Sequence, residues 1–181
     1  MISGLIPHRY AKALYKYGKE TGADKELYDC MKTVIAAYRS TPELQKTMSN
    51  PYVDKSEKKR LLATVAGKGA DDAYNRFVTL VLDHDREEFF ELMAYAFRDI
   101  YRKANNISQV RITTAVEMAD DELGRIREVV EKSYPESKFE YDTVVNPDLI
   151  GGFIIDVDST RLDASISGEL EQLRQNLLTG N

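Results

Sequence analysis

The sequence has little cysteine and no long apolar run, and both shortages narrow what the protein can be. Cys30 is the only cysteine among 181 residues, so we expect a buried thiol in a helix and no intrachain disulfide or cysteine-based zinc cluster. No stretch approaches about 20 consecutive apolar residues, which excludes a membrane-spanning helix. The segment Met1–Tyr10 has no charged stretch followed by an apolar run and is not rich in Arg and Ser, so we expect no secretory signal or organellar transit segment.

The chain also lacks an excess of positive charge. The chain carries 25 Lys and Arg against 30 Asp and Glu, a net charge of -5, whereas a nucleic-acid-binding domain usually has a basic excess. Two local basic clusters occur, at Lys55, Lys58, Lys59 and Arg60 and at Arg98, Arg102 and Lys103. Both are interleaved with acidic residues and lack a run of aromatic residues, which is typical of a solvated helix face. We therefore expect no nucleic-acid partner.

The residue patterns of common catalytic sites are missing. Gly67-Lys68-Gly69 lacks the spacing and the hydroxyl of a phosphate-binding loop, and Gly151-Gly152 lacks the third glycine of a dinucleotide fingerprint. His8 and His84 are far apart in sequence, with no ligand-type neighbours. Pairs of acidic residues stand where helices are expected to begin, a position that favours capping. We expect no catalytic residue, no cofactor, no metal and no small-molecule substrate.

The first hundred residues show apolar side chains at helical spacing throughout. Glycine, proline and acidic capping residues divide this part into six expected helices. They run from Pro7 to Gly22, from a cap at Asp24 through Tyr38, from Pro42 to about Met48, from a cap at Asp54 to Gly67, around Tyr74–Val81, and from a capping pair at Asp85 and Glu88 to Ala104.

The pattern changes after Asn105-Asn106. Val110, Ile112 and Thr114 alternate with polar residues, which predicts a strand. A helix capped by Asp120 or Asp121 and closed by Pro135 is expected next, followed by strands at 139–145 and 152–157 and a short hairpin return at 161–163. A last helix is expected from a cap at Asp163 or Ser165. Its apolar stripe consists of Ile166, Leu170, Leu173 and Leu177. The predicted organisation is a helical domain at 1–105 and a small α/β domain at 106–181. The second domain has about 75 residues, a marginal size that predicts mobility or completion by a partner.

The block Asn146–Ile155, which contains Leu-Ile-Gly-Gly, is followed by Arg161–Ser165 and the leucine-rich helix. This order resembles the C-terminal signature of the ATP synthase delta subunit family, which includes the mitochondrial oligomycin-sensitivity-conferring protein. Three further segments are similar to the family in the same order: Arg9–Tyr15, Phe77–Arg86 and Val110–Ala115. The chain departs from the family pattern at His84, Asn106, Asp156 and Asp158.

The resemblance implies a mostly helical fold, a six-helix bundle followed by a small α/β domain. It implies a non-catalytic stator subunit of an F-type ATP synthase, linking the alpha/beta head to the peripheral b stalk and resisting rotor torque during proton-driven ATP synthesis. The expected partners are the N-termini of alpha subunits and the C-termini of b subunits. The expected location is peripheral, on the cytoplasmic side of a bacterial inner membrane.

The resemblance also implies two sets of binding residues. An amphipathic helix from an alpha subunit is expected in a groove between the first and fifth helices, at Tyr10, Leu14, Tyr17, Tyr74, Phe77, Val78 and Val81. Ordinary core packing is the alternative for these side chains, and we expect about half to point inward and half to line the groove. The side that binds the b subunits is expected at Leu149, Gly151, Gly152, Phe153, Leu170, Leu173 and Leu177.

A regulatory adaptor that binds a partner's amphipathic helix is the main alternative function. It explains a helical bundle but not the Leu-Ile-Gly-Gly block with the helix that follows. An enzyme is a third hypothesis, which the missing catalytic motifs disfavour.

Overall fold

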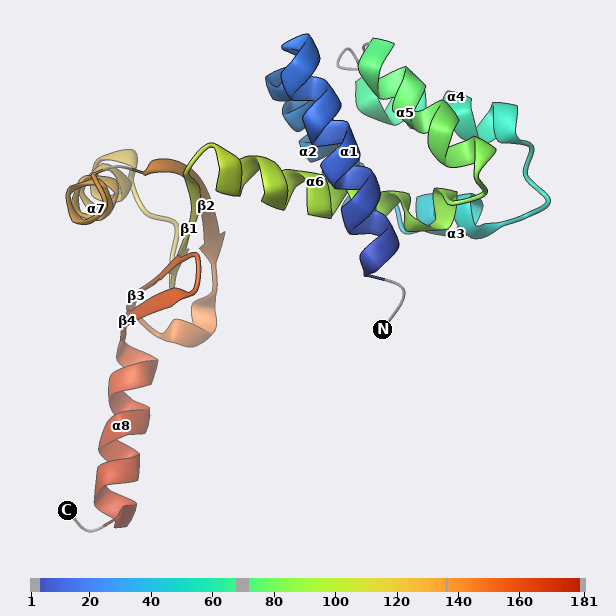
Figure 1. Ribbon diagram of the computed structural model, residues 1–181. Coiled ribbons are helices and arrows are strands. Elements are labelled where there is room, and N and C mark those ends of the chain that lie inside the picture. Colours follow the sequence, from blue (N-terminus) through green and yellow to red (C-terminus); the bar gives the residue numbers. More distant parts are fainter. Residues whose placement is uncertain (1–3, 68–71, 136, 180–181) are drawn as a thin grey trace. The chain divides into compact units, whose positions relative to one another are not determined.

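The computed structural model describes residues 4–67, 72–135 and 137–179. The chain divides into two compact units, Met1–Ala104 and Asn105–Asn181 (Figure 1). Within the described ranges no helix is both long enough and apolar enough to cross a membrane. The predicted fold class, mostly helical with a small α/β part at the C-terminal side, is confirmed.

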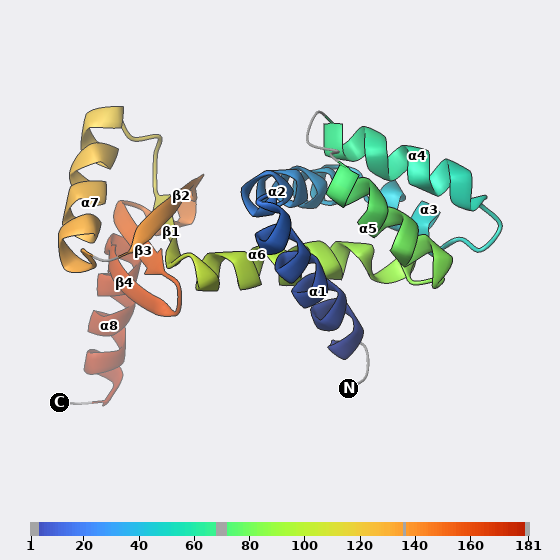
Figure 2. The ribbon, with the colours of Figure 1, turned by 45° about the horizontal axis from the view of Figure 1, so that its top comes forward.

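Six α-helices are described in the first unit. They are α1 (Leu5–Thr21), α2 (Asp24–Ser40), α3 (Glu43–Ser49), α4 (Lys55–Ala66), α5 (Asp72–Asp83) and α6 (Phe90–Ala104), with a 3-10 turn, η2, at Glu87–Phe89. Helix α6 packs against both α1 and α2 (Figure 2). Large side chains fill the space between the helices, among them Leu27, Met31, Tyr74, Phe90 and Phe97. Cys30 is a buried thiol, as predicted.

Some of the predicted helix ends are confirmed and others are wrong. Gly22 closes α1 with φ 73°, and the Asp54 carboxylate caps α4 by accepting a hydrogen bond from the Ser56 N–H at 2.7 Å. Asp24 is not a cap: it lies in the first turn of α2, after Ala23, and pairs with Lys19 at 2.8 Å. Asp85 does not open α6.

Asp85 instead ends α5. Its N–H donates to the Leu82 carbonyl, and the N–H of Arg86 donates to the Val81 carbonyl, at 3.2 and 3.0 Å. With Asp85 at φ 53°, this is the Schellman arrangement, in which a left-handed residue closes a helix. The 3-10 turn η2 follows, so α6 begins only at Phe90.

Lys58 is a second correction within the bundle. The sequence favours a solvated position, but its side chain is 2% exposed and its ammonium lies 2.7 Å from the Glu87 carboxylate. Next to it, Lys55 pairs with Asp85 at 2.6 Å in a position open to solvent. The two ion pairs tie the start of α4 to the turn between α5 and α6.

The second unit contains a four-stranded sheet. Its elements are β1 (Ile107–Thr114), α7 (Asp120–Ser133), β2 (Lys138–Val145), the 3-10 turn η3 (Pro147–Leu149), β3 (Gly152–Val157), β4 (Thr160–Ser165) and α8 (Ile166–Thr179). The strand order is β2-β1-β3-β4. Strand β1 is parallel to β2, with α7 as the crossover, and the other two pairings are antiparallel. β4 is longer than the predicted return at 161–163, and α7 begins after Ala119, whose N–H donates to Glu122 at 3.3 Å.

One face of this sheet carries the core of the second unit. Val110, Ile112 and Ile155 pack there against Leu123 and Ile126, and Val130 belongs to the same cluster. Tyr141 on β2 also reaches α7, donating to Glu131 at 3.2 Å, and its burial, together with the Glu131 charge, raises its pKa to about 12. The opposite face is polar, with ion pairs Arg111–Asp142 at 3.2 Å and Arg161–Asp156 at 2.6 Å. The apolar core is therefore confined to one side of the sheet.

Candidate partner-binding surfaces

The seven residues predicted to form the groove for the alpha subunit lie on α1 and α5. Tyr10 of α1 meets Phe77 and His84 edge-on, with ring centroids 6.5 Å apart in both cases. Tyr10 and Tyr17 are half-buried. The other five are buried: Leu14, Tyr74, Phe77, Val78 and Val81. More of this set is core than the expected half.

Tyr74 shows how firmly that core is held. Its hydroxyl donates to the Leu62 carbonyl at 2.9 Å, and burial raises its pKa above the ordinary value of a tyrosine. Periodicity could not separate the core members from the accessible ones, because a side chain that fills a core and one that lines a groove have the same helical spacing. Tyr10 and Tyr17 are the members of the set that keep accessible surface.

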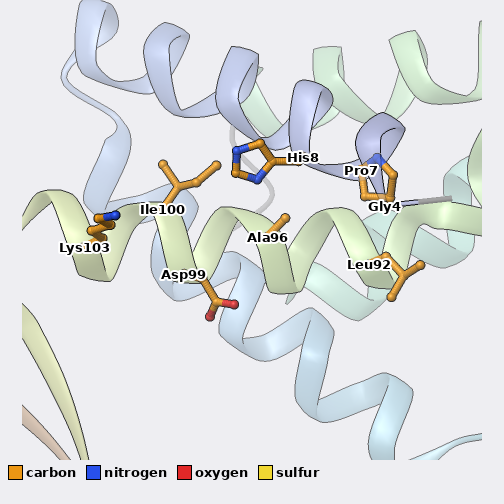
Figure 3. A pocket seen from close by; sticks show the side chains of 8 residues that line it. All are labelled: Gly4, Pro7, His8, Leu92, Ala96, Asp99, Ile100 and Lys103. Atoms are coloured by element: carbon orange, nitrogen blue, oxygen red, sulfur yellow. The ribbon is translucent and has the colours of Figure 1, made fainter. Parts of the chain in front are cut away.

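An open apolar pocket of about 470 Å³ lies between α1 and α6, on a side of α1 that the sequence did not single out (Figure 3). The residues lining it, which we call the α1–α6 groove, are Gly4, Pro7, His8, Leu92, Ala96, Asp99, Ile100 and Lys103. In the sequence, only the apolar stripe on one face of α6 hints at this groove. The spacing of that stripe does not show whether the face is buried or exposed.

The last helix, α8, has an uncovered apolar stripe. Leu170, Leu173 and Leu177 are 52%, 57% and 83% exposed, and Ile166 at the start of the stripe is 45% exposed. The helix leads away from the sheet and does not lie across it (Figure 1). These side chains recur at intervals of four, three and four residues, the narrow seam of a helix that packs against another helix.

The base of α8 is fixed by hydrogen bonds from both predicted caps. The Ser165 hydroxyl accepts from the Gly168 N–H at 3.1 Å. Asp163 in turn accepts from the N–H and the hydroxyl of Ser165, at 2.9 and 2.6 Å, and these bonds hold the pKa of Asp163 below its ordinary value. Because the pKa of Asp163 is lower in the folded state, the stabilisation from these hydrogen bonds is present at neutral pH. It is lost only as the pH falls through that lowered pKa.

The other residues predicted for the side that binds the b subunits surround this base. The Gly151 carbonyl accepts from the Ile166 N–H at 3.1 Å, and a Cβ on Gly151 would lie 2.6 Å from the Ile166 side chain. Leu149 is buried, and Phe153 packs partly against the sheet core. These residues hold the start of α8, and their part in binding stays a prediction. Gly151 and Gly152 both stand where other parts of the chain approach closely.

Gly152→Ala is expected to destabilise the protein more than Gly22→Ala. Both glycines have φ 73°, a conformation that costs a side chain about 1–2 kcal/mol, but a Cβ at Gly152 would also collide with the Ala164 carbonyl oxygen, whereas Gly22 faces open space. We expect the free energy of unfolding to fall by about 1–2 kcal/mol for Gly22→Ala and by about 2–4 kcal/mol for Gly152→Ala. Urea denaturation measures both, and equal losses would show that the β4 backbone does not restrict this position.

Comparisons with known proteins cover nearly the whole chain. A family profile described as ATP synthase delta (OSCP) subunit matches residues 6–177. The chain is 36% identical to ATP synthase subunit delta of Phocaeicola vulgatus, over 100% of this chain and 98% of that protein. It is also 36% identical to the protein of the same name from Parabacteroides distasonis, over 98% of each.

A solved structure has the same fold. A chain in the cryo-EM structure of the Toxoplasma gondii mitochondrial ATP synthase hexamer superposes with a TM-score of 0.73, covering 95% of this chain and 97% of that one. The two sequences are 18% identical, so this similarity concerns the fold.

Proposed function

The chain belongs to the ATP synthase delta (OSCP) subunit family, and we propose that it is the connector that ties the catalytic alpha/beta head to the peripheral b stalk. It is a stator component of an ATP synthase. In this role it carries out no chemistry of its own, and it holds the head against the torque of the rotor during proton-driven ATP synthesis.

The exposed apolar stripe of α8 is the observation that carries this proposal. Leu170, Leu173 and Leu177 would each bring about 1.5–3 kcal/mol if a partner covered them fully, yet they stay more than half exposed in the isolated chain. A helix from the C-terminal end of a b subunit, placed along this seam, would bury them. Large apolar contact favours slow dissociation, which a connector under repeated load requires.

The bundle is proposed to bind the N-terminal segment of an alpha subunit as an amphipathic helix along α1 and α5. The members of the predicted set that keep accessible surface there are Tyr10 and Tyr17. Aromatic side chains beside an apolar seam are typical anchors for a helix bound in a groove. The buried members of the predicted set would support these anchors from below.

The proposed location is peripheral to a bacterial inner membrane, on its cytoplasmic side. The relatives from Phocaeicola vulgatus and Parabacteroides distasonis are bacterial, which supports the bacterial part. Attachment to the membrane would come through the complex. The adaptor hypothesis loses its support, because the family match extends over both units.

A synthetic peptide with the N-terminal sequence of an alpha subunit is expected to bind the full chain, with a dissociation constant in the micromolar range or tighter. Tyr10→Glu should weaken that binding by about tenfold or more, since it places a charge where an apolar anchor is buried. Tyr52→Glu, at a side chain that is 95% exposed, is the matched control and should bind like the unaltered chain. Isothermal titration calorimetry measures all three, and no binding to the unaltered chain at micromolar peptide would contradict this part of the proposal.

A further inference from the structure

We propose that the α1–α6 groove is a second helix-docking site, whose occupant is an amphipathic helix of a partner protein with carboxylates beside its apolar face. The proposal goes beyond the function given above, because this groove lies on the α6 side of α1. Tyr10, on the α5 side, makes its contacts with Phe77 and His84. His8 and Pro7 line the groove instead.

The shape of the groove fits a helix. On α6 its wall runs from Leu92 through Ala96 and Ile100 to Lys103, a single stripe at intervals of four, four and three residues. At about 1.5 Å per residue this wall is about 16 Å long, three turns of a helix. The first turns of α1 form the opposite wall (Figure 3). A short helix laid along the groove would match this length without needing any free backbone edge.

Most of the residues that line the groove are apolar. Gly4 and Ala96 let another backbone approach closely, and Leu92, 47% exposed, stands at one end as a contact for incoming apolar side chains. Ala96 and Ile100 are half-buried. The groove therefore offers apolar surface from Leu92 to Ile100.

The charged residues at the edge of the groove indicate which charge its occupant carries. Exposed Lys103 stands at the end of the α6 wall, and exposed Lys12 follows His8 one turn along α1. Asp99 is the one carboxylate that lines the groove among the described residues, and Arg98 already binds it through two N–H groups at 3.0 and 2.8 Å. Residues 1–104 carry 18 Lys and Arg against 15 Asp and Glu, in a chain whose net charge is -5. A helix with Glu or Asp flanking its apolar face is the complementary partner.

The test uses the full chain and two designed 14-residue amphipathic peptides with the same leucine stripe, one flanked by Glu and one by Lys. Fluorescence anisotropy should give about fivefold or more tighter binding of the Glu-flanked peptide, as expected for a few rim charge pairs. Leu92→Gln should weaken that binding by about tenfold, whereas Leu61→Gln, a leucine of α4 that is 36% exposed, should leave it unchanged. Lys103→Glu should reverse the preference between the two peptides.

Equal binding of both peptides, or no effect of Leu92→Gln, would overturn the proposal, as would no binding of either peptide. Self-association that Leu92→Gln abolishes would assign the groove to a second copy of the chain and also overturn it. None of these outcomes bears on the peptide from the alpha subunit, whose binding is probed at Tyr10, so failure here and failure of the proposed function are distinguishable.

Discussion

A chain carrying Leu170→Glu and Leu173→Glu is expected to fold normally and to lose at least about 100-fold in affinity for the C-terminal segment of a b subunit. Both leucines are more than half exposed in the isolated protein, so their replacement removes little of the fold's own packing. Covered by a partner helix, each is worth about 1.5–3 kcal/mol, and every 1.4 kcal/mol is a tenfold change in affinity. Two carboxylates pressed into an apolar contact add a desolvation penalty.

The control for this experiment adds the same charge to the other side of the same helix. Gln172→Glu together with Gln175→Glu changes two exposed positions that lie off the leucine stripe, and binding should stay within about threefold of the unaltered chain, as for exposed charges in general. Calorimetric titration gives the affinities, and thermal unfolding checks that both variants are folded. Unchanged binding by the leucine variant would remove α8 from the proposed stalk contact.

Lys58→Met is expected to lower the free energy of unfolding by about 3–5 kcal/mol, the usual cost of leaving the partner of a buried ion pair without its counter-charge. The Lys58 side chain is 2% exposed and that of Glu87 is 12% exposed. One oxygen of Glu87 is buried with no hydrogen-bond partner among the described residues. The carboxylate therefore depends on the Lys58 ammonium for compensation. Urea denaturation of the full chain measures the loss.

Lys55→Met is the matched control, one turn earlier on α4. Its partner Asp85 is as close, at 2.6 Å, but the two side chains are 51% and 76% exposed, and such a pair contributes little to stability because solvent screens it. The double variant Lys58→Met with Glu87→Leu should recover most of the stability, since it removes both charges. Similar losses for Lys58→Met and Lys55→Met would show that burial of the pair does not matter.

The parts of the fold that local sequence controls were predictable. Alternation at Val110 and Ile112 identified β1, because successive side chains of a strand face opposite sides. Gly22 marked the end of α1, because a left-handed residue is required there. The prediction for Asp85 was wrong, because the same residue type caps helix starts and also tolerates the left-handed conformation at helix ends.

The candidate surfaces were predictable only in part. The leucine stripe of α8 could be identified from its spacing, and so could the apolar stripe of α5 that contains Val81. The α1–α6 groove could not be identified, because its walls come from segments about 90 positions apart in the sequence. The burial of Lys58 was likewise beyond prediction, since its partner Glu87 comes from a turn 29 positions further along the chain.

The sequence by itself determined the order of the elements, the family and the two apolar stripes, because periodicity and turn residues are local properties of the chain. Only the tertiary structure decided which stripe is covered. Val81 is 0% exposed and Leu173 is 57% exposed, although both lie on helices with regular apolar spacing. Spacing defines a face of a helix, and whether that face is buried depends on segments that fold against it from elsewhere in the chain.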